Sequence, residues 1–188
     1  MIFQKTPIEG VYVIEPELKK DSRGYFTRLF CKEEFKTAGI DFDAVQISKS
    51  FTKEKGTLRG LHFQREPKWE QKVVQCTRGS VYNVVADVRK KSPTFGKWFG
   101  IELNESNRKM VYTPKGFVNG CQTLSDNSEL LYWIGEYYVL ELTAGIRYDD
   151  PTLNIIWPYP PFALSEKDKE LPFLKETQDN LYTGELLS

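Results

Sequence analysis

The hydrophobic and polar positions of this chain fall into short segments rather than long helical stretches. The segments are rich in Val, Ile, Tyr, Phe and Thr, and a turn signal containing Gly, Asp or Pro precedes most of them. These residue types favour strands, and many short strands at such spacing predict a sandwich or barrel. The clearest candidate strands cover residues 11–14, 25–30, 58–64, 80–88, 117–124 and 130–134.

Helical signals are few and short. Residues 32–38, which end at Gly39, fit one short helix with a glycine stop. Ser165 is a candidate N-cap for a second short helix. Proline interrupts residues 92–96 and 157–161, so we expect both to be edge or connecting segments.

These elements together predict an all-β fold with a few short helices. The expected arrangement is a double-stranded β-helix, or cupin-like jelly roll, closed around a cavity. The length suits one domain, so residues 1–188 are predicted to form a single cupin domain. The polar residues 179–188 are expected to form a loose C-terminal tail.

The composition narrows the classes of partner and compartment. The 26 basic and 26 acidic residues cancel, which removes any global attraction toward nucleic acid or an anionic membrane. Cys31, Cys76 and Cys121 are widely spaced and odd in number, which indicates reduced thiols rather than disulfides. No apolar stretch is long enough for a signal peptide or a membrane span. We therefore expect a soluble cytoplasmic protein with no nucleic-acid or membrane partner.

His62 is the only histidine in the chain of 188 residues. Histidine is the side chain best suited to acid–base chemistry near neutral pH, so such chemistry would fall to His62. One imidazole cannot supply the ligand set of the usual transition-metal sites, so no metal is expected. On a regular strand Arg59 and His62 face opposite sides, and a shared cavity therefore predicts a bulge near Gly60. An ordinary core or surface histidine is the alternative interpretation.

Lys72, Tyr132 and Asp168 are further candidates for chemistry, although each also has an ordinary structural explanation. Lys72 with Arg59 could bind a phosphate or a developing oxyanion, or Lys72 could simply be solvated. Tyr132 lies in a buried-looking strand, where a core tyrosine with a satisfied hydroxyl is common. Asp168 comes three residues after Ser165, where an acidic side chain also favours a helix N-terminus.

The order of several motifs along the chain carries more information than any single residue. They are Asp21-x-Arg23-Gly24-Tyr25-Phe26, Leu58-Arg59-Gly60-Leu61-His62-Phe63-Gln64, Gln71-Lys72-Val73-Val74, Ser92-Pro93-Thr94-Phe95-Gly96, Pro114-x-Gly116-Phe117, Tyr132 with Tyr137-Tyr138, Asp149-Asp150-Pro151-x-Leu153-x-Ile155-x-Trp157-Pro158, and Leu164-Ser165-x-Lys167-Asp168. With these motifs the chain resembles the dTDP-4-dehydrorhamnose 3,5-epimerase family, the RmlC-like cupin sugar epimerases, from about Pro7 to about Pro172.

The resemblance implies a jelly-roll homodimer without a metal or redox cofactor. It also implies 3,5-, 5- or 3-epimerisation of a nucleotide-linked 4-keto-6-deoxyhexose in deoxysugar biosynthesis. By this resemblance His62 removes a proton next to the C4 ketone, and Asp168 accepts a hydrogen bond from the far nitrogen of His62. Lys72 stabilises the enolate, and Tyr132 returns a proton from the opposite face.

The resemblance also assigns substrate-binding positions. Arg23 and Arg59 match residues that bind the substrate, whose diphosphate is the obvious anion, and Tyr138 matches a tyrosine that stacks on the nucleotide base. Part of the N-terminal segment reaches the partner's site in this family, so Arg23 and Arg28 are expected to act across a dimer interface. The predicted binding residues are Arg23, Phe26, Arg28, Gln46, Ser48, Arg59, Asn119, Tyr138, Thr143 and Lys167.

Four matched binding positions depart from the family's pattern. Asn119 replaces a histidine, Ser48 replaces an asparagine, and Arg28 and Thr143 each replace an acidic residue. The four catalytic candidates are kept, so we expect that deprotonation is retained while recognition has changed in a more electropositive pocket. One alternative substrate is a CDP-linked 4-keto-3,6-dideoxyhexose, epimerised at C5 alone as in an ascarylose-type pathway. A nucleotide-sugar 3,4-ketoisomerase and a non-catalytic sugar-nucleotide binding module are also compatible with these residues.

Overall fold

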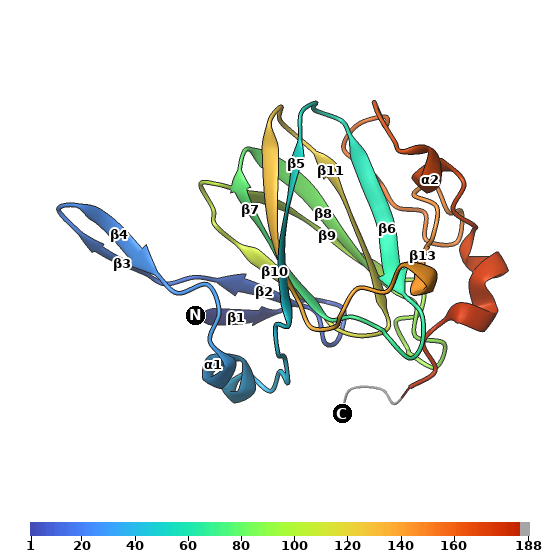
Figure 1. Cartoon of the computed structure of the whole chain (residues 1–188), viewed down its shortest axis with the longest axis horizontal. Helices are drawn as coiled ribbons and strands as arrows, with labels where there is room; N and C mark the ends of the chain where they lie inside the picture. Colours follow the sequence, from blue (N-terminus) through green and yellow to red (C-terminus); the bar gives the residue numbers. More distant parts are fainter. Residues whose placement is uncertain (185–188) are drawn as a thin grey trace.

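In the computed structural model, which describes residues 1–184, two antiparallel sheets face each other (Figure 1). The six-stranded sheet runs β1 (Ile2–Lys5), β2 (Tyr12–Glu15), β10 (Met110–Thr113), β7 (Lys72–Arg78), β12 (Ser128–Ile134) and β5 (Gln46–Thr52). The five-stranded sheet runs β13 (Thr143–Gly145), β6 (Leu58–Gln64), β11 (Phe117–Thr123), β8 (Ser80–Asp87) and β9 (Trp98–Asn104). The predicted all-β, cupin-like fold is confirmed.

The helices are as short as the sequence predicts. Helix α1 (Lys32–Thr37) is followed at Gly39 by a positive φ of 81°, a backbone conformation that favours glycine. Helix α2 (Glu166–Lys169) has Ser165 as its N-cap, whose side chain accepts a hydrogen bond from the backbone of Asp168. Within residues 1–184 there are also two 3-10 helices, η1 (Leu140–Leu142) and η2 (Leu174–Asn180). No helix within residues 1–184 has the length and apolar character needed to cross a membrane.

The predicted strand over residues 25–30 is shorter and differently placed. Strand β4 (Gly24–Thr27) ends at Thr27 and pairs only with β3 (Leu18–Asp21), so the two form a separate hairpin. Figure 1 shows this hairpin projecting from the body of the molecule. The proline-containing segments 92–96 and 157–161 lie outside the strands, as expected.

The inner faces of the two sheets form the central hydrophobic core. Val74 and Leu130 from one sheet pack with Val85 and Phe117 from the other. Cys121 also belongs to this core, and burial raises the pKa of its thiol to about 12, so the side chain behaves as a small apolar group. Alternation of side chains along each strand produces this face, since every second residue points inward.

Additional layers cover the outer faces of both sheets. On the six-stranded sheet, Phe35 of α1 and Phe42 pack against Tyr112, with ring centroids 6.3 and 5.8 Å from it. On the five-stranded sheet, Leu61 and Val118 pack with side chains from the C-terminal segment, among them Leu153, Leu174 and Leu181.

The expectation of a loose tail over residues 179–188 is wrong for Leu181 and Tyr182. Leu181 is buried in the outer core, and the Tyr182 ring lies 5.5 Å from that of Trp69. These two apolar side chains bury surface against the sheet, and that gain outweighs the polar character of their neighbours. Residues 185–188 lie outside the described part of the chain.

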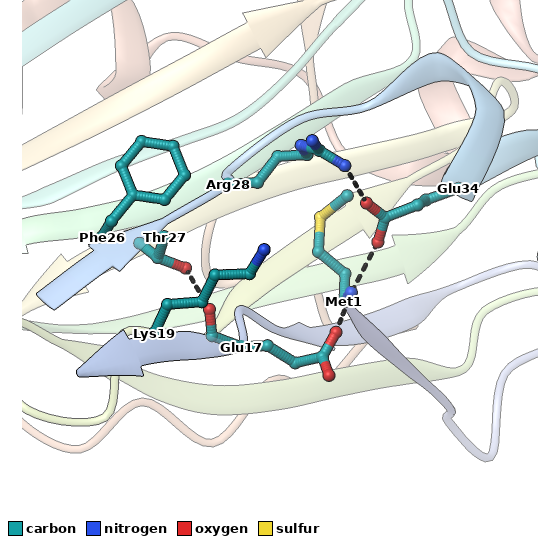
Figure 2. A pocket seen from close by; sticks show the side chains of 7 residues that line it. All are labelled: Met1, Glu17, Lys19, Phe26, Thr27, Arg28 and Glu34. Carbon is teal, nitrogen blue, oxygen red and sulfur yellow. Dashed lines mark hydrogen bonds and ion pairs between the residues drawn. The ribbon is translucent and has the colours of Figure 1, made fainter. Parts of the chain in front are cut away.

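A small cavity of about 140 Å³ lies at the base of the hairpin (Figure 2). The amino group of Met1 contacts the carboxylates of Glu17 and Glu34, each at 2.6 Å. Arg28 donates to the other oxygen of Glu34 at 2.9 Å. Figure 2 shows these contacts joining the start of the chain, the hairpin and helix α1. The base of the hairpin is thereby tied to the body.

A buried polar network fixes the end of β8. The carboxylate of Asp87 is fully buried and accepts hydrogen bonds from Arg89 at 2.7 and 2.9 Å, and from Ser92 and Thr94 at 2.6 Å each. Burial opposes ionisation of Asp87, but the bonds from Arg89, Ser92 and Thr94 outweigh it and hold the pKa of the carboxyl below its usual range. The network therefore secures the turn after β8 through a fully satisfied buried charge.

We expect Asp87→Asn to lower the free energy of unfolding by about 3–5 kcal/mol, because it leaves the Arg89 guanidinium buried without its counter-ion. Urea denaturation measures this change. Asp43→Asn is the matched control, since it removes the partner of Lys32 at 2.6 Å on the exposed surface and should leave the midpoint nearly unchanged. Equal effects of the two substitutions would contradict the stabilising role of the buried Asp87–Arg89 pair.

At acidic pH the wild-type protein should lose its greater unfolding free energy relative to Asp87→Asn. Since the folded-state pKa of Asp87 is lowered, its stabilisation is complete above the ordinary pKa and disappears as the pH falls through the folded-state value. The difference in unfolding free energy should therefore stay constant between about pH 7 and 5 and narrow below about pH 4. A difference that is constant down to the lowest accessible pH would contradict this cause.

Candidate active site

A cavity of about 630 Å³ opens between the two sheets and brings together most of the predicted site residues. The four catalytic candidates come from three places. His62 lies on β6 of one sheet, Lys72 and Tyr132 lie on β7 and β12 of the other, and Asp168 lies on helix α2. The predicted residues that line this cavity are His62, Asp168, Tyr132, Lys72, Ser48, Arg59, Asn119, Tyr138, Thr143 and Lys167.

A bulge in β6 turns two of the candidate side chains toward the same side. His62 pairs with Asn119 of β11, whereas Arg59 pairs with Cys121, so two residues of β6 lie opposite the single Gly120. Arg59 and His62 both line the cavity as a result. The bulge predicted near Gly60 is confirmed.

Gly60 is required at this bulge for both backbone and steric reasons. Its φ is +107°, a region that residues with a Cβ rarely adopt. A Cβ atom there would lie 2.8 Å from the Cα of Gly120 and 2.9 Å from the carbonyl oxygen of Asn119. The two strands can approach this closely only because both positions are glycine.

His62 and Asp168 form a directly hydrogen-bonded pair, with 2.5 Å between His62 Nε2 and Asp168 Oδ1. Asp168 is buried, and its other carboxylate oxygen lies 3.4 Å from the backbone nitrogen of Gly60. Burial opposes ionisation, but the bonds from His62, Gly60 and Ser165 outweigh it and keep the pKa of Asp168 below its usual range. The contact through Nε2 leaves His62 Nδ1 as the ring nitrogen available to a substrate.

Tyr132 enters the cavity from the opposite sheet. Its hydroxyl lies 3.3 Å from the Ser50 hydroxyl of the neighbouring strand β5. Burial raises the pKa of this hydroxyl above its ordinary value, so the phenol is fully protonated at neutral pH.

Lys72 enters from the same sheet as Tyr132 and is paired with a carboxylate. Its Nζ lies 2.5 Å from Oε1 of Glu70, and each side chain is about nine-tenths buried, at 12% and 13% exposure. Sequence reasoning missed both Glu70 and Ser50. The available signals were an acidic residue two positions before a candidate lysine and a serine in a short strand, and both patterns are common.

Two cations of the cavity have no carboxylate partner among the described residues. Arg59 donates to the Thr52 hydroxyl at 3.0 Å and to the carbonyl oxygen of Phe51 at 3.3 Å. Lys167 donates to the Thr143 hydroxyl at 3.3 Å. Such cations are suited to binding an anionic group. Within residues 1–184, no group of three His, Cys, Asp or Glu side chains gathers as metal ligands do.

The amide of Asn119 has a fixed orientation. Its Nδ2 donates to the backbone carbonyl of Val84 at 2.9 Å and to Oδ1 of Asn83 at 3.0 Å. Because a backbone carbonyl can only accept, this contact settles which end of the amide is the donor. The Asn119 oxygen is thereby left as an acceptor in the lining of the cavity.

The remaining predicted binding residues lie at the rim or away from the cavity. Tyr138 is 59% exposed, and its backbone N–H donates to Gln46 Oε1 at 2.8 Å, so Gln46 adjoins the rim without lining the cavity. Arg23, Phe26 and Arg28 belong to the projecting hairpin and its base, and none of them lines the cavity of the same chain. Arg28 is neutralised by Glu34, so it adds no positive charge to that cavity.

This fold and site define a protein of the cupin-like jelly-roll class, with a histidine–aspartate pair facing a tyrosine and a lysine across one cavity, an arrangement suited to acid–base chemistry. A family model described as dTDP-4-dehydrorhamnose 3,5-epimerase matches residues 5–176. The chain belongs to this family.

Comparison with known proteins agrees with this assignment. The chain is 40% identical over 177 residues to the dTDP-4-dehydrorhamnose 3,5-epimerase of Sinorhizobium fredii, covering 94% of this chain and 91% of the relative. The crystal structure of RmlC from Legionella pneumophila, in complex with dTDP-4-keto-L-rhamnose, has a TM-score of 0.93 at 34% identity and covers 98% of this chain and 99% of that one.

A relative that inverts one centre has the same fold. ChmJ, a 3'-monoepimerase from Streptomyces bikiniensis in complex with dTDP-quinovose, superposes with a TM-score of 0.85 at 32% identity, covering 93% of this chain and 88% of that one. The predicted enzyme class, an isomerase that epimerises deoxysugars, is confirmed by the family and by these relatives.

We expect Gly60→Ala to abolish most epimerase activity and to lower the free energy of unfolding by about 1–3 kcal/mol, because the added Cβ separates β6 from β11. Gly39→Ala is the matched control. Gly39 also has a positive φ, but its Cβ would meet nothing within 4 Å, so strain without a clash should cost stability and spare activity. Activity and unfolding midpoint are measured together; a fully active Gly60→Ala protein would contradict the role of the bulge.

Proposed function

We propose that the protein epimerises a nucleotide-linked 4-keto-6-deoxyhexose by removing a proton next to the C4 ketone. The observation that carries this proposal is the His62–Asp168 pair on one side of the cavity, with Tyr132 on the opposite sheet. Inversion of a carbon centre needs a base on one face of the sugar and an acid on the other. Side chains from two facing sheets can supply both.

The proposed reaction is balanced in two proton transfers. His62 Nδ1 takes the proton from C5, or from C3, and the electron pair of that C–H bond moves through the new C=C bond onto the C4 oxygen. The Asp168 carboxylate stabilises the imidazolium, and Lys72 donates a hydrogen bond to the enolate oxygen. The enolate then collapses and takes the Tyr132 proton on the other face. Water later removes the proton of His62 and returns one to Tyr132.

The anion of the proposed substrate fits the two cations without carboxylate partners. Arg59 and Lys167 line the same cavity, and the diphosphate of a nucleotide-sugar would neutralise them. The names of the relatives support dTDP as the nucleotide. Asn119 and Thr143, which cannot ionise, line the cavity where the family's pattern has ionisable residues, and they support the alternative of a CDP-linked 3,6-dideoxy sugar inverted at C5 alone.

We expect the protein to incorporate solvent deuterium into dTDP-4-keto-6-deoxyglucose, and His62→Ala to slow this exchange by about 10²–10⁴-fold because positioned proton transfer is lost. NMR in heavy water measures label at C3 and C5, with the CDP-linked sugar and its 3-deoxy analogue run in parallel. Label at both carbons supports a double epimerase. Preference for the CDP-linked 3-deoxy sugar, with label at C5 only, supports inversion at that single centre.

Two further results would overturn the proposal. A 3-keto product in the same spectra would identify a 3,4-ketoisomerase. Calorimetric binding of dTDP without exchange on any of the sugars would identify a binding module. Tyr132→Phe provides a check on the direction of proton return, because loss of the acid should suppress inversion more strongly than the first exchange at the carbon.

We further infer that the active protein is a homodimer whose hairpin completes the partner's site. The Arg23 side chain is 88% exposed and, among residues 1–184, bonds to Asp21 of its own hairpin alone, and Phe26 is 68% exposed. The hairpin extends well beyond the two sheets (Figure 1), and neither side chain lines the cavity of its own chain, which supports a contact with another molecule.

Mixed dimers test the hairpin proposal. We expect Arg23→Ala and His62→Ala proteins to be impaired separately, and to regain activity when they are unfolded and refolded together. If Arg23 acts across the interface, one site of each mixed dimer contains an intact His62 and an intact Arg23. If Arg23 acts within its own chain, every site of the mixture carries one defect and activity does not return. Sedimentation of the mixture confirms that dimers formed.

We also infer a single domain and a cytoplasmic location. The C-terminal segment packs on the five-stranded sheet through Leu174 and Leu181, which supports one continuous unit. Cys31, Cys76 and Cys121 are all unpaired, which supports a reducing compartment.

A further inference from the structure

The cavity contains an ion pair whose acidic member has no assigned role. Glu70 and Lys72 are both largely buried, lie 2.5 Å apart between Oε1 and Nζ, and both line the cavity. A pair this buried contributes little net stability, because desolvation of both charges offsets their attraction. Its presence beside the catalytic groups therefore calls for an explanation in terms of the reaction.

Glu70 is the charged group that determines where the Lys72 ammonium lies. The cross-strand neighbours of Lys72 are Thr113 on β10 and Ile134 on β12, and neither carries a charge. The Thr113 hydroxyl is buried and has no hydrogen-bond partner among the described residues. Within the described chain, Glu70 is also the carboxylate that forms an ion pair with Lys72. The position of the ammonium thus depends on one contact.

The cations that line the cavity differ in whether a carboxylate neutralises them. Arg59 and Lys167 have hydroxyl and carbonyl partners, so their full positive charge is available to a bound anion. Lys72 is compensated by Glu70, so it is a weak attractor of the substrate's diphosphate in the ground state. An ammonium that bound the diphosphate would stabilise substrate and transition state alike, and it would not be free for the enolate.

We propose that Glu70 is a positioning residue that holds Lys72 for the developing enolate and keeps it from binding the diphosphate. The inference rests on the proposed function, since it names what controls the enolate-stabilising group of that reaction. Negative charge appears on the C4 oxygen only as the proton leaves. The ammonium, already fixed and desolvated, then donates to that oxygen without first reorganising.

Glu70→Gln separates this role from a structural one. Without the carboxylate, Lys72 is released and the cavity gains one unit of positive charge. We expect kcat to fall by about 10- to 100-fold, the range for a misplaced catalytic group. We expect calorimetry to show dTDP binding several-fold more tightly, because the released ammonium is available to phosphate. A distorted cavity would instead weaken dTDP binding.

Glu129→Gln is the matched control. Glu129 pairs with Lys49, another lysine of the cavity lining, at 3.3 Å, and its loss changes the net charge by the same amount. We expect kcat of this variant to stay within about twofold of the wild-type value, because no proposed step depends on Lys49. Glu70→Asp keeps the charge but shortens the side chain, so dTDP affinity should match wild type while kcat falls in part.

A double substitution tests whether the two residues act as one unit. If Glu70 acts only through Lys72, adding Glu70→Gln to Lys72→Met lowers kcat no further. Unchanged kcat in Glu70→Gln, weaker dTDP binding, or additive losses in the double variant would each overturn the inference. Failure of the proposed function is distinguishable, since it would appear as a wild-type protein that exchanges no deuterium while the dTDP affinities still report on the pair.

Discussion

The close approach of β6 and β11 at the bulge is the constraint on which the active site depends. Gly60 and Gly120 meet where any side chain would separate the strands, and Gly145 on the other neighbouring strand packs against the carbonyl oxygen of Leu61. Because glycines surround the bulge, β6 can accommodate one extra residue there and still pair with both neighbouring strands, β11 and β13. The insertion reverses the alternation of side chains, so Arg59 and His62 share a cavity while Leu61 remains in the outer core.

The outer layer of the protein reaches the candidate active site through Asp168. This residue does not belong to either sheet, since it lies on α2 in the C-terminal segment that packs on the five-stranded sheet. Ser165 caps the helix, and the backbone nitrogen of Gly60 faces the Asp168 carboxylate. The bulge therefore shapes the strand that carries His62, and through the Gly60 backbone it also contributes a polar contact to Asp168. Changes in the C-terminal packing are expected to reach the reaction by this route.

Local patterns predicted the short helices, the N-cap at Ser165 and most strands, because these depend on nearby residues. The bulge was also predictable, since a shared cavity for Arg59 and His62 is incompatible with regular pleating. The packing of Leu181 and the separate hairpin were not, because both depend on which surfaces meet in space. Glu70 was missed for a similar reason: an acidic residue before a strand is usually solvated, and only burial beside Lys72 makes it unusual.

The positions expected to depart from the family's pattern are held by different contacts from the candidate proton-transfer groups. His62, Asp168, Lys72 and Tyr132 are each fixed by a charged partner or a hydroxyl contact inside the site. Asn119 and Thr143 line the same cavity but donate to the backbone carbonyls of Val84 and Leu140, and Asn119 also donates to Oδ1 of Asn83. None of these bonds goes to one of the four acid–base candidates, so substrate recognition could change at both positions while those candidates keep their contacts. The same jelly-roll fold occurs in a 3,5-epimerase and in a 3'-monoepimerase, so the fold alone does not set the number of centres inverted, and the residues that line the cavity must do so.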